Sequence, residues 1–159
     1  MLHDLVNLYL PMIFGIAMVV VGMYFKSHIY MTIGENGINT PDAKTDIFKW
    51  MCAQAIGPRI MIRLGTADII VTFLVGVLSL AFNYDTAKIC TVSSVIGAGF
   101  LLAALAFINE KLGYFSPEWL YDDDKEKKEM WIKTFTDYAE RKEYGKLIKF
   151  VEADMIQPD

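Results

Sequence analysis

Few residues in this chain suit metal, disulfide or phosphate chemistry. The 159 residues include only two cysteines and two histidines. No glycine-rich phosphate loop, no H-E-x-x-H pair and no G-x-S-x-G nucleophile motif occurs. We therefore expect no metal ion, no cofactor and no enzyme activity, and we expect no nucleic-acid partner.

Charge is also missing from three long stretches of the sequence. Residues 5–25 and 89–109 each form 21 positions without a charged side chain, and 69–84 form sixteen. A bilayer core needs roughly 20 helical residues, and the middle stretch reaches that length if its helix begins near Gly65. A soluble bundle is the alternative, but its helices would normally keep a polar face. We predict three transmembrane helices, at about 6–25, 65–84 and 89–109.

The basic residues are concentrated between the first two predicted spans and after the third. The first eight residues contain no Lys or Arg, residues 26–67 contain five, and the chain from Lys111 onward contains nine of the fifteen. Lys and Arg near helix ends are retained on the cytoplasmic side. We therefore expect the N-terminus outside and the C-terminus in the cytoplasm. No basic segment precedes the first stretch, which favours a mature helix over a signal peptide.

These patterns predict an all-α integral membrane protein with two domains. Residues 1–112 would form the three-span membrane domain, including a cytoplasmic loop at 26–64, and residues 113–159 a cytoplasmic helical tail. Within the loop, residues 42–56 have the apolar spacing of an amphipathic helix on the membrane surface. Thr40 or Asp42 would cap it, Gly57-Pro58 would end it, and Trp50 would lie at headgroup level.

A carboxyl within a transmembrane helix is a candidate functional group by default. Asp68 lies near the start of the second span, five residues after Arg63. It is either a helix-start carboxylate or cap, favoured by the helix dipole, or the partner of Arg59 or Arg63 in an ion pair. Both interpretations place Asp68, Arg59 and Arg63 at the membrane interface.

Small residues recur four apart in the third span, as in the pair Ser93 and Gly97 and the pair Gly99 and Ala103. Small residues at this spacing let helix backbones approach closely in lipid. We expect this helix to pack against the other spans of the same chain. Self-association of two copies through the third helix is the alternative.

The tail has two apolar stripes at helical spacing. Each predicted helix is too short to be stable alone, so the stripes must pack on each other, on the predicted helix at 42–56 or on another protein. These interpretations stay open. The last makes the tail a docking module whose partner contacts are Trp131, Phe135, Tyr138, Leu147 and Val151.

The loop carries the run Gly37-Ile38-Asn39-Thr40-Pro41, followed by Asp46 and by Phe48-Lys49-Trp50. Over residues 10–109 this order resembles the SdpI-type membrane proteins, the bacterial immunity family against a sporulation-delaying toxin. In that family a transmembrane helix is followed by a Gly-Leu/Ile-Arg-Thr-Pro turn, an acidic residue, an aromatic-rich helix and two further spans. Asn39 stands where the family usually has Arg. The resemblance implies a bacterial cell membrane and a motif loop made of Gly37, Asn39, Thr40, Pro41 and Trp50.

Two kinds of function fit this sequence. The first is binding in immunity or signalling, as the SdpI-type resemblance implies. The second is a membrane anchor or accessory subunit that docks a cytoplasmic partner through its tail. Membrane lipid is a partner in both.

Overall fold

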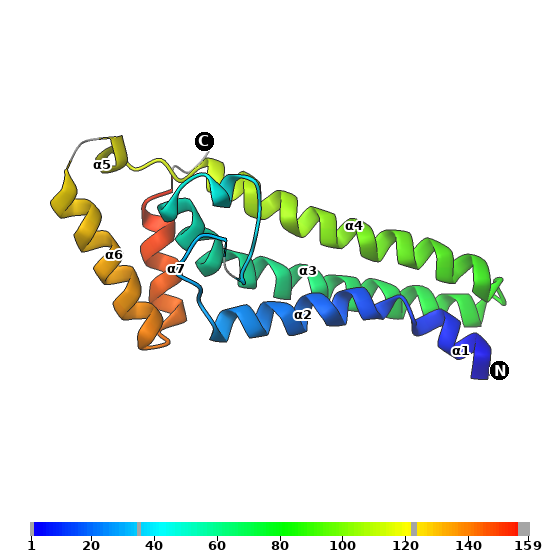
Figure 1. Ribbon diagram of the computed structural model, residues 1–159. Helices are drawn as coiled ribbons and strands as arrows, with labels where there is room; N and C mark the ends of the chain where they lie inside the picture. Colours follow the sequence, from blue (N-terminus) through cyan, green and yellow to red (C-terminus); the bar gives the residue numbers. More distant parts are fainter. Residues whose placement is uncertain (1, 35, 122–123, 156–159) are drawn as a thin grey trace. The chain divides into compact units, whose positions relative to one another are not determined.

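The computed structural model describes residues 2–34, 36–121 and 124–155, and their side chains except those of 2–5, 118 and 121. Within this part of the chain every regular element is a helix, which confirms the all-α prediction. Phe115 and Met155 form one isolated antiparallel bridge. In order, the elements are α1 (Leu2–Tyr9), α2 (Met12–Ser27), the 3-10 helix η1 (Asp42–Lys44), α3 (Ile47–Ala81), α4 (Thr86–Gly113), α5 (Glu118–Tyr121), α6 (Lys125–Glu140) and α7 (Tyr144–Ala153) (Figure 1).

The chain divides into two compact units. Unit 1 comprises Met1–Met23 and Arg59–Leu105, and unit 2 comprises Tyr24–Pro58 and Ala106–Asp159. Unit 1 therefore holds α1 and most of α2, α3 and α4. The predicted loop, up to Pro58, falls in the same unit as the predicted tail.

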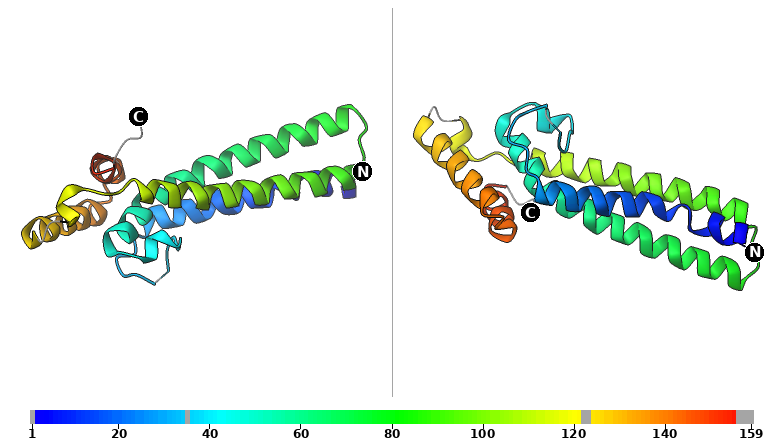
Figure 2. Two further views of the ribbon diagram at one scale, coloured as in Figure 1. Left: turned by 90° about the horizontal axis from the view of Figure 1, so that it is seen from above. Right: turned by 60° about the horizontal axis from the view of Figure 1, so that its bottom comes forward.

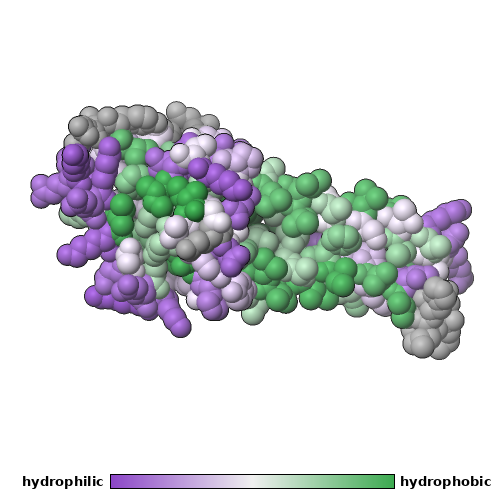
Figure 3. Space-filling view, in the orientation of Figure 1, coloured by the Kyte–Doolittle hydropathy of each residue, from purple (hydrophilic) through white to green (hydrophobic). Residues whose placement is uncertain are grey.

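Unit 1 carries its large apolar side chains on the outside. Of the 23 large hydrophobic residues exposed in the described part of the chain, nineteen belong to this unit, including Phe73 at 51% and Leu102 at 68% exposure. The visible surface over α2, α3 and α4 is correspondingly hydrophobic (Figure 3). Two of these helices, α3 and α4, are long and apolar enough to cross a membrane, whereas α2 is shorter.

The first apolar stretch is not one helix, so the prediction of a continuous helix at 6–25 is wrong. Helix α1 ends at Tyr9 and α2 begins at Met12. The break follows from Pro11, which has no N–H and whose ring crowds the carbonyl group of the preceding turn. A new hydrogen-bonded turn starts there, because the Phe14 N–H donates to the Pro11 carbonyl oxygen at 3.2 Å.

Helix α3 also differs from the prediction. Gly57-Pro58 does not end a helix, since Pro58 lies inside the 35 residues of α3. Residues 51–58 are all buried, so this part of α3 has no face left for a membrane surface. The separate amphipathic helix predicted at 42–56 is therefore wrong. Packing of this stretch on every side stabilises a helical turn that proline would otherwise break.

Unit 2 has an apolar interior. Of the twenty hydrophobic residues buried in the described part of the chain, sixteen belong to unit 2, among them Phe48, Trp50, Phe115 and Phe135. Helices α6 and α7 lie side by side as a hairpin in all three views (Figures 1 and 2). Large apolar side chains are thus mostly exposed in unit 1 and mostly buried in unit 2.

Candidate functional site

Helices α2 and α3 cross in unit 1 at two glycines. A Cβ atom on Gly15 would lie 2.6 Å from the Gly65 carbonyl oxygen, and one on Gly65 would lie 2.7 Å from the Gly15 carbonyl oxygen. The two backbones are therefore in direct contact, as small residues permit in membrane helices. Gly97 of α4 faces α2 in the same way, since a Cβ there would meet the Phe14 ring at 3.0 Å. Gly97 therefore packs within the chain as predicted, whereas a Cβ atom on Gly99 would meet nothing within 4 Å.

Asp68 lies at the glycine crossing and is fully buried. Its Oδ2 atom would be 2.8 Å from a Cβ on Gly15. Within the described residues, neither carboxyl oxygen of Asp68 makes a well-formed hydrogen bond, although the backbone of Gly15 lies beside the carboxyl group. Thr72 Oγ1 and Ser93 Oγ also have no hydrogen-bond partner there. Asp68 and Thr72, four residues apart, share one face of α3. We call this pair on α3 the Asp68 row: Asp68 and Thr72. Ser93, on α4, is a third buried polar residue of unit 1.

Neither interpretation of Asp68 made from the sequence holds. Helix α3 begins at Ile47, so Asp68 is deep in the helix and cannot be its cap. The ion-pair interpretation fails because both carboxyl oxygens lack a partner among the described residues. Arg59 and Arg63 lie on the exposed side of α3. Asp68 is therefore a carboxyl in the interior of unit 1.

The loop before α3 is held against the helix by one buried amide. The Ile38 N–H donates to Gln54 Oε1 at 3.1 Å, and Gln54 Nε2 donates to the Ile38 carbonyl oxygen at 3.2 Å. Gln54 is 1% exposed and Ile38 is 3% exposed. The Gln54 side chain thus satisfies both polar groups of a buried backbone unit, as a neighbouring strand would.

Further hydrogen bonds fix the rest of this loop. Asn109 of α4 accepts from the Asp42 N–H at 3.1 Å and donates to the Asp42 carboxylate at 3.0 Å. Trp50 Nε1 donates to the Tyr30 carbonyl oxygen at 2.8 Å. Since Trp50 is fully buried, its ring is part of the interior of unit 2 and not a headgroup anchor. The loop is an ordered strap over the beginning of α3.

The motif residues alternate between the inside and the outside of this strap. Thr40 is buried and its hydroxyl accepts the Ala43 N–H at 3.3 Å. Asn39 and Pro41 are exposed, and Asn39 Nδ2 donates to the Gly37 carbonyl oxygen at 3.3 Å. The structure therefore brings Gly37, Asn39, Thr40, Pro41 and Trp50 into one folded segment.

Sequence reasoning missed the residues that hold the strap. Gln54 and Asn109 stand alone as amides in apolar runs, MCAQAIG and AFIN. That isolation was the available signal, because an amide in such a run needs a specific partner. Asp46, whose carboxylate accepts the Phe48 N–H at 2.6 Å and so caps α3, was also missed as a cap.

The predicted contact residues of the tail lie mostly inside unit 2. Trp131, Phe135, Leu147 and Val151 are buried, and Tyr138 is half-buried. Trp131 is the centre of a ring cluster, and its Nε1 donates to Asp154 Oδ2 at 2.6 Å. The stripes of α6 and α7 therefore pack on each other and on Phe48 near the start of α3. The ring cluster comprises Phe48, Phe115, Trp119, Trp131, Phe135, Tyr138 and Phe150, with neighbouring centroids 5.3–6.5 Å apart.

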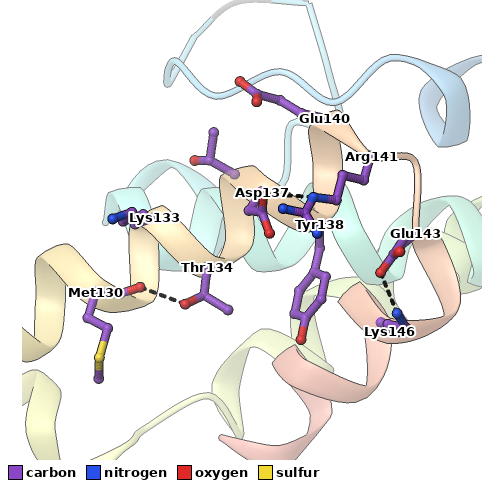
Figure 4. Close-up of a pocket in the computed structure, with 10 residues that line it drawn as sticks. Met130, Lys133, Thr134, Asp137, Tyr138, Glu140, Arg141, Glu143 and Lys146 are labelled. Carbon is purple, nitrogen blue, oxygen red and sulfur yellow. Dashed lines mark hydrogen bonds and ion pairs between the residues drawn. The ribbon is translucent and has the colours of Figure 1, made fainter.

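The outer side of the α6–α7 hairpin is polar instead. A broad hollow of about 920 Å³ is lined by charged side chains of both signs (Figure 4). Two pairs are internal to it: Arg141 Nε with Asp137 at 2.9 Å, and Lys146 Nζ with Glu143 at 2.8 Å. The hydrogen bond from Lys146 to the Glu143 carboxylate raises the pKa of Lys146. We call this the hairpin surface: Lys133, Asp137, Glu140, Arg141, Glu143 and Lys146.

Helix α7 is tied to the end of α2 within unit 2. The Tyr144 hydroxyl donates to the Phe25 carbonyl oxygen at 3.1 Å, and the Lys26 ammonium lies 5.6 Å from the centre of the Tyr144 ring. Burial raises the pKa of the Tyr144 hydroxyl. Proton loss from this group would therefore work against the packing of α7.

No arrangement of catalytic type stands out. Across the described residues, no group of three or more His, Cys, Asp and Glu side chains is placed to hold a metal ion. Ser27 Oγ lies 2.8 Å from His28 Nδ1, but the hydroxyl is also 2.8 Å from the Tyr24 carbonyl oxygen and donates to it. The histidine therefore has no serine proton to accept, as an activated nucleophile would require.

Comparisons with protein-family models, with curated proteins and with solved structures each gave no match to this chain. The SdpI-type resemblance therefore stays a prediction from the motif loop.

Proposed function

We propose that this chain is an integral membrane protein that acts by binding a protein partner. The observation that supports membrane integration is the reversed distribution of side chains in unit 1, with apolar residues outside and glycine, hydroxyl and carboxyl groups inside. In water, such a surface costs about 25 cal/mol of free energy per Å² of exposed apolar area. Contact with the hydrocarbon tails of lipids does not carry this cost. Helix-to-helix contact in lipid then relies on small and polar residues.

Three segments of unit 1 would cross the bilayer. The parts of α3 and α4 within it, residues 59–81 and 86–105, would be about 34 Å and 30 Å long at 1.5 Å per residue, close to the ~30 Å hydrocarbon core. Helices α1 and α2 would cross together, with the break at Pro11 inside the protein, where proline is tolerated. The basic residues favour unit 2 on the cytoplasmic side, in a bacterial cell membrane if the SdpI-type resemblance holds.

Unit 2 would be the binding part. It has its own aromatic interior, so the α6–α7 hairpin is formed before any partner arrives, which reduces the entropic cost of association. The docking contacts would then be the exposed residues of the hairpin surface. Immunity or signalling of the SdpI type is the first role we propose, and an accessory subunit that docks a cytoplasmic partner is the second.

Orientation is tested by cysteine labelling in intact cells. Cys52 and Cys90 are replaced by alanine, and one cysteine is introduced at position 3 or position 125. We expect an impermeant thiol reagent to label position 3 and not position 125. The opposite pattern would contradict the orientation, and labelling of both positions would contradict a third crossing by α1 and α2.

Binding is tested by purification in mild detergent. We expect a stoichiometric protein to co-purify with the wild type and to be lost from the double variant Lys133→Glu, Arg141→Glu, whose substitutions reverse two charges of the hairpin surface. Lys88→Glu, at the exposed α3–α4 turn, is the matched control and should retain the partner. A partner that stays bound to both variants would exclude the hairpin surface.

A further inference from the structure

We propose that Asp68 is a cation-binding carboxyl in the interior of unit 1, which takes one monovalent cation, H⁺ or Na⁺, from water. The inference rests on the proposed function in one respect, because it assumes that unit 1 lies in the bilayer. It adds a ligand site to a chain otherwise proposed to act by binding protein.

Asp68 lies inside the proposed span, beyond the last exposed charge of α3. At 1.5 Å per residue it is about 7.5 Å from Arg63 and about 20 Å from Ala81. A carboxylate that is ionised and unpaired at such depth in a low-dielectric medium is among the most costly groups a protein can bury. A positive charge must therefore accompany Asp68.

The surrounding helices do not supply that charge. On α2, which packs against Asp68 at Gly15, no titratable side chain occurs from Met12 to Met23, and on α4 none occurs from residue 91 to 109. The described part of α1 offers Tyr9, which instead contacts Gly76, two turns further along α3. On α3 itself, the nearest charges are Arg59 and Arg63, which are exposed, and the carboxyl oxygens contact neither.

The burial of Asp68 also restricts what can bring the charge. The residue is 0% exposed, so the long side chain of another protein has no access to its carboxyl group. A single ion can enter through small fluctuations of packed helices. The missing charge is therefore an ion of atomic size and not a basic residue of a partner.

The Asp68 row provides the oxygen atoms that such an ion needs. Thr72 Oγ1 follows one helical turn after Asp68 on the same face of α3 and lacks a partner among the described residues. A hydroxyl can both donate and accept, so this group can stabilise a protonated carboxyl, coordinate Na⁺ or hold water. Buried oxygens without partners are rare in folded proteins, and all four such atoms among the described residues belong to unit 1.

The test is modification by dicyclohexylcarbodiimide, an apolar reagent that adds to protonated carboxyl groups. The purified full-length protein is treated in detergent at a series of pH values, and the modified residue is located by mass spectrometry. We expect labelling of Asp68 that increases as the pH falls. Protection by NaCl, but not by choline chloride at equal ionic strength, identifies Na⁺ as the ion, and absence of protection identifies H⁺.

Matched variants separate the site from general reactivity. Asp68→Asn should lose the label, whereas Asp85→Asn, in the exposed α3–α4 turn, should keep it. Thr72→Val should change the pH or Na⁺ dependence of labelling, and Thr66→Val, on the exposed side of α3, should not. An Asp68 that is never labelled, or labelled without dependence on pH or Na⁺, would overturn the inference. If the cysteine labelling in intact cells gives the expected pattern and Asp68 does not behave as described, only this inference fails and the proposed function stands.

Discussion

The contact between Gln54 and the loop gives the sharpest prediction for stability. Gln54→Met keeps the length and burial of the side chain but removes both hydrogen bonds to Ile38. Each buried backbone group left without a hydrogen-bond partner costs about 1–3 kcal/mol. The two groups together should therefore lower the free energy of unfolding of the variant by about 2–6 kcal/mol. Small domains are stable by only about 5–15 kcal/mol, so we expect the strap to detach from α3 before unit 2 unfolds.

Amide hydrogen exchange of the detergent-solubilised protein measures this directly. We expect fast exchange in peptides covering residues 28–46 of the Gln54→Met variant, with protection of α4 unchanged. Asn39→Ala is the control, since it removes one exposed hydrogen bond in the same loop and should change stability by less than about 0.5 kcal/mol. If the strap of Gln54→Met exchanged its amide hydrogens as slowly as the strap of the wild type, the reasoning would be refuted, because another contact would then hold the loop.

Three further predictions follow from the packing and burial described above. Gly15→Leu should separate α2 from α3 and lower the melting temperature in detergent, because its Cβ atom would already overlap backbone atoms. Gly99→Ala should leave the melting temperature unchanged, because the space around Gly99 is open. Phe135→Ala should destabilise unit 2 by about 3–5 kcal/mol in denaturant titrations, and the exposed Met130→Ala by far less. Burial raises the pKa of Tyr144 from its usual 10.0, so the unfolded chain loses that proton first as the pH rises. The free energy of unfolding should therefore fall as the pH rises above this value, and it should fall less steeply in Tyr144→Phe.

Features carried within a single helix could be predicted from the sequence. The apolar runs that became α3 and α4 and the small face around Gly97 depend on residues three or four apart, so they are visible without tertiary information. The stripes of α6 and α7 were found for the same reason. What they contact was left open, because the sequence does not say whether a stripe meets its own chain or another.

The strap and the state of Asp68 could not be predicted, because both depend on contacts distant in sequence. Gln54 meets Ile38 sixteen residues away, and Asn109 meets Asp42 sixty-seven residues away. Residues 51–58 became a continuous helix through Pro58 because these neighbours surround them. Asp68 was assigned to a helix start because the sequence did not show that α3 begins twenty-one residues earlier.

The ring cluster has a consequence for spectroscopy. The chain has three tryptophans, Trp50, Trp119 and Trp131, and all of them belong to unit 2. The rings of Trp119 and Trp131 lie 5.9 Å apart, close enough for their electronic transitions to couple and give a strong near-ultraviolet circular dichroism signal. Indole fluorescence and this signal therefore report on unit 2 alone, while unit 1 contributes no indole emission. Melting followed by tryptophan emission and by helical ellipticity should give two different curves whenever the two units lose their structure separately.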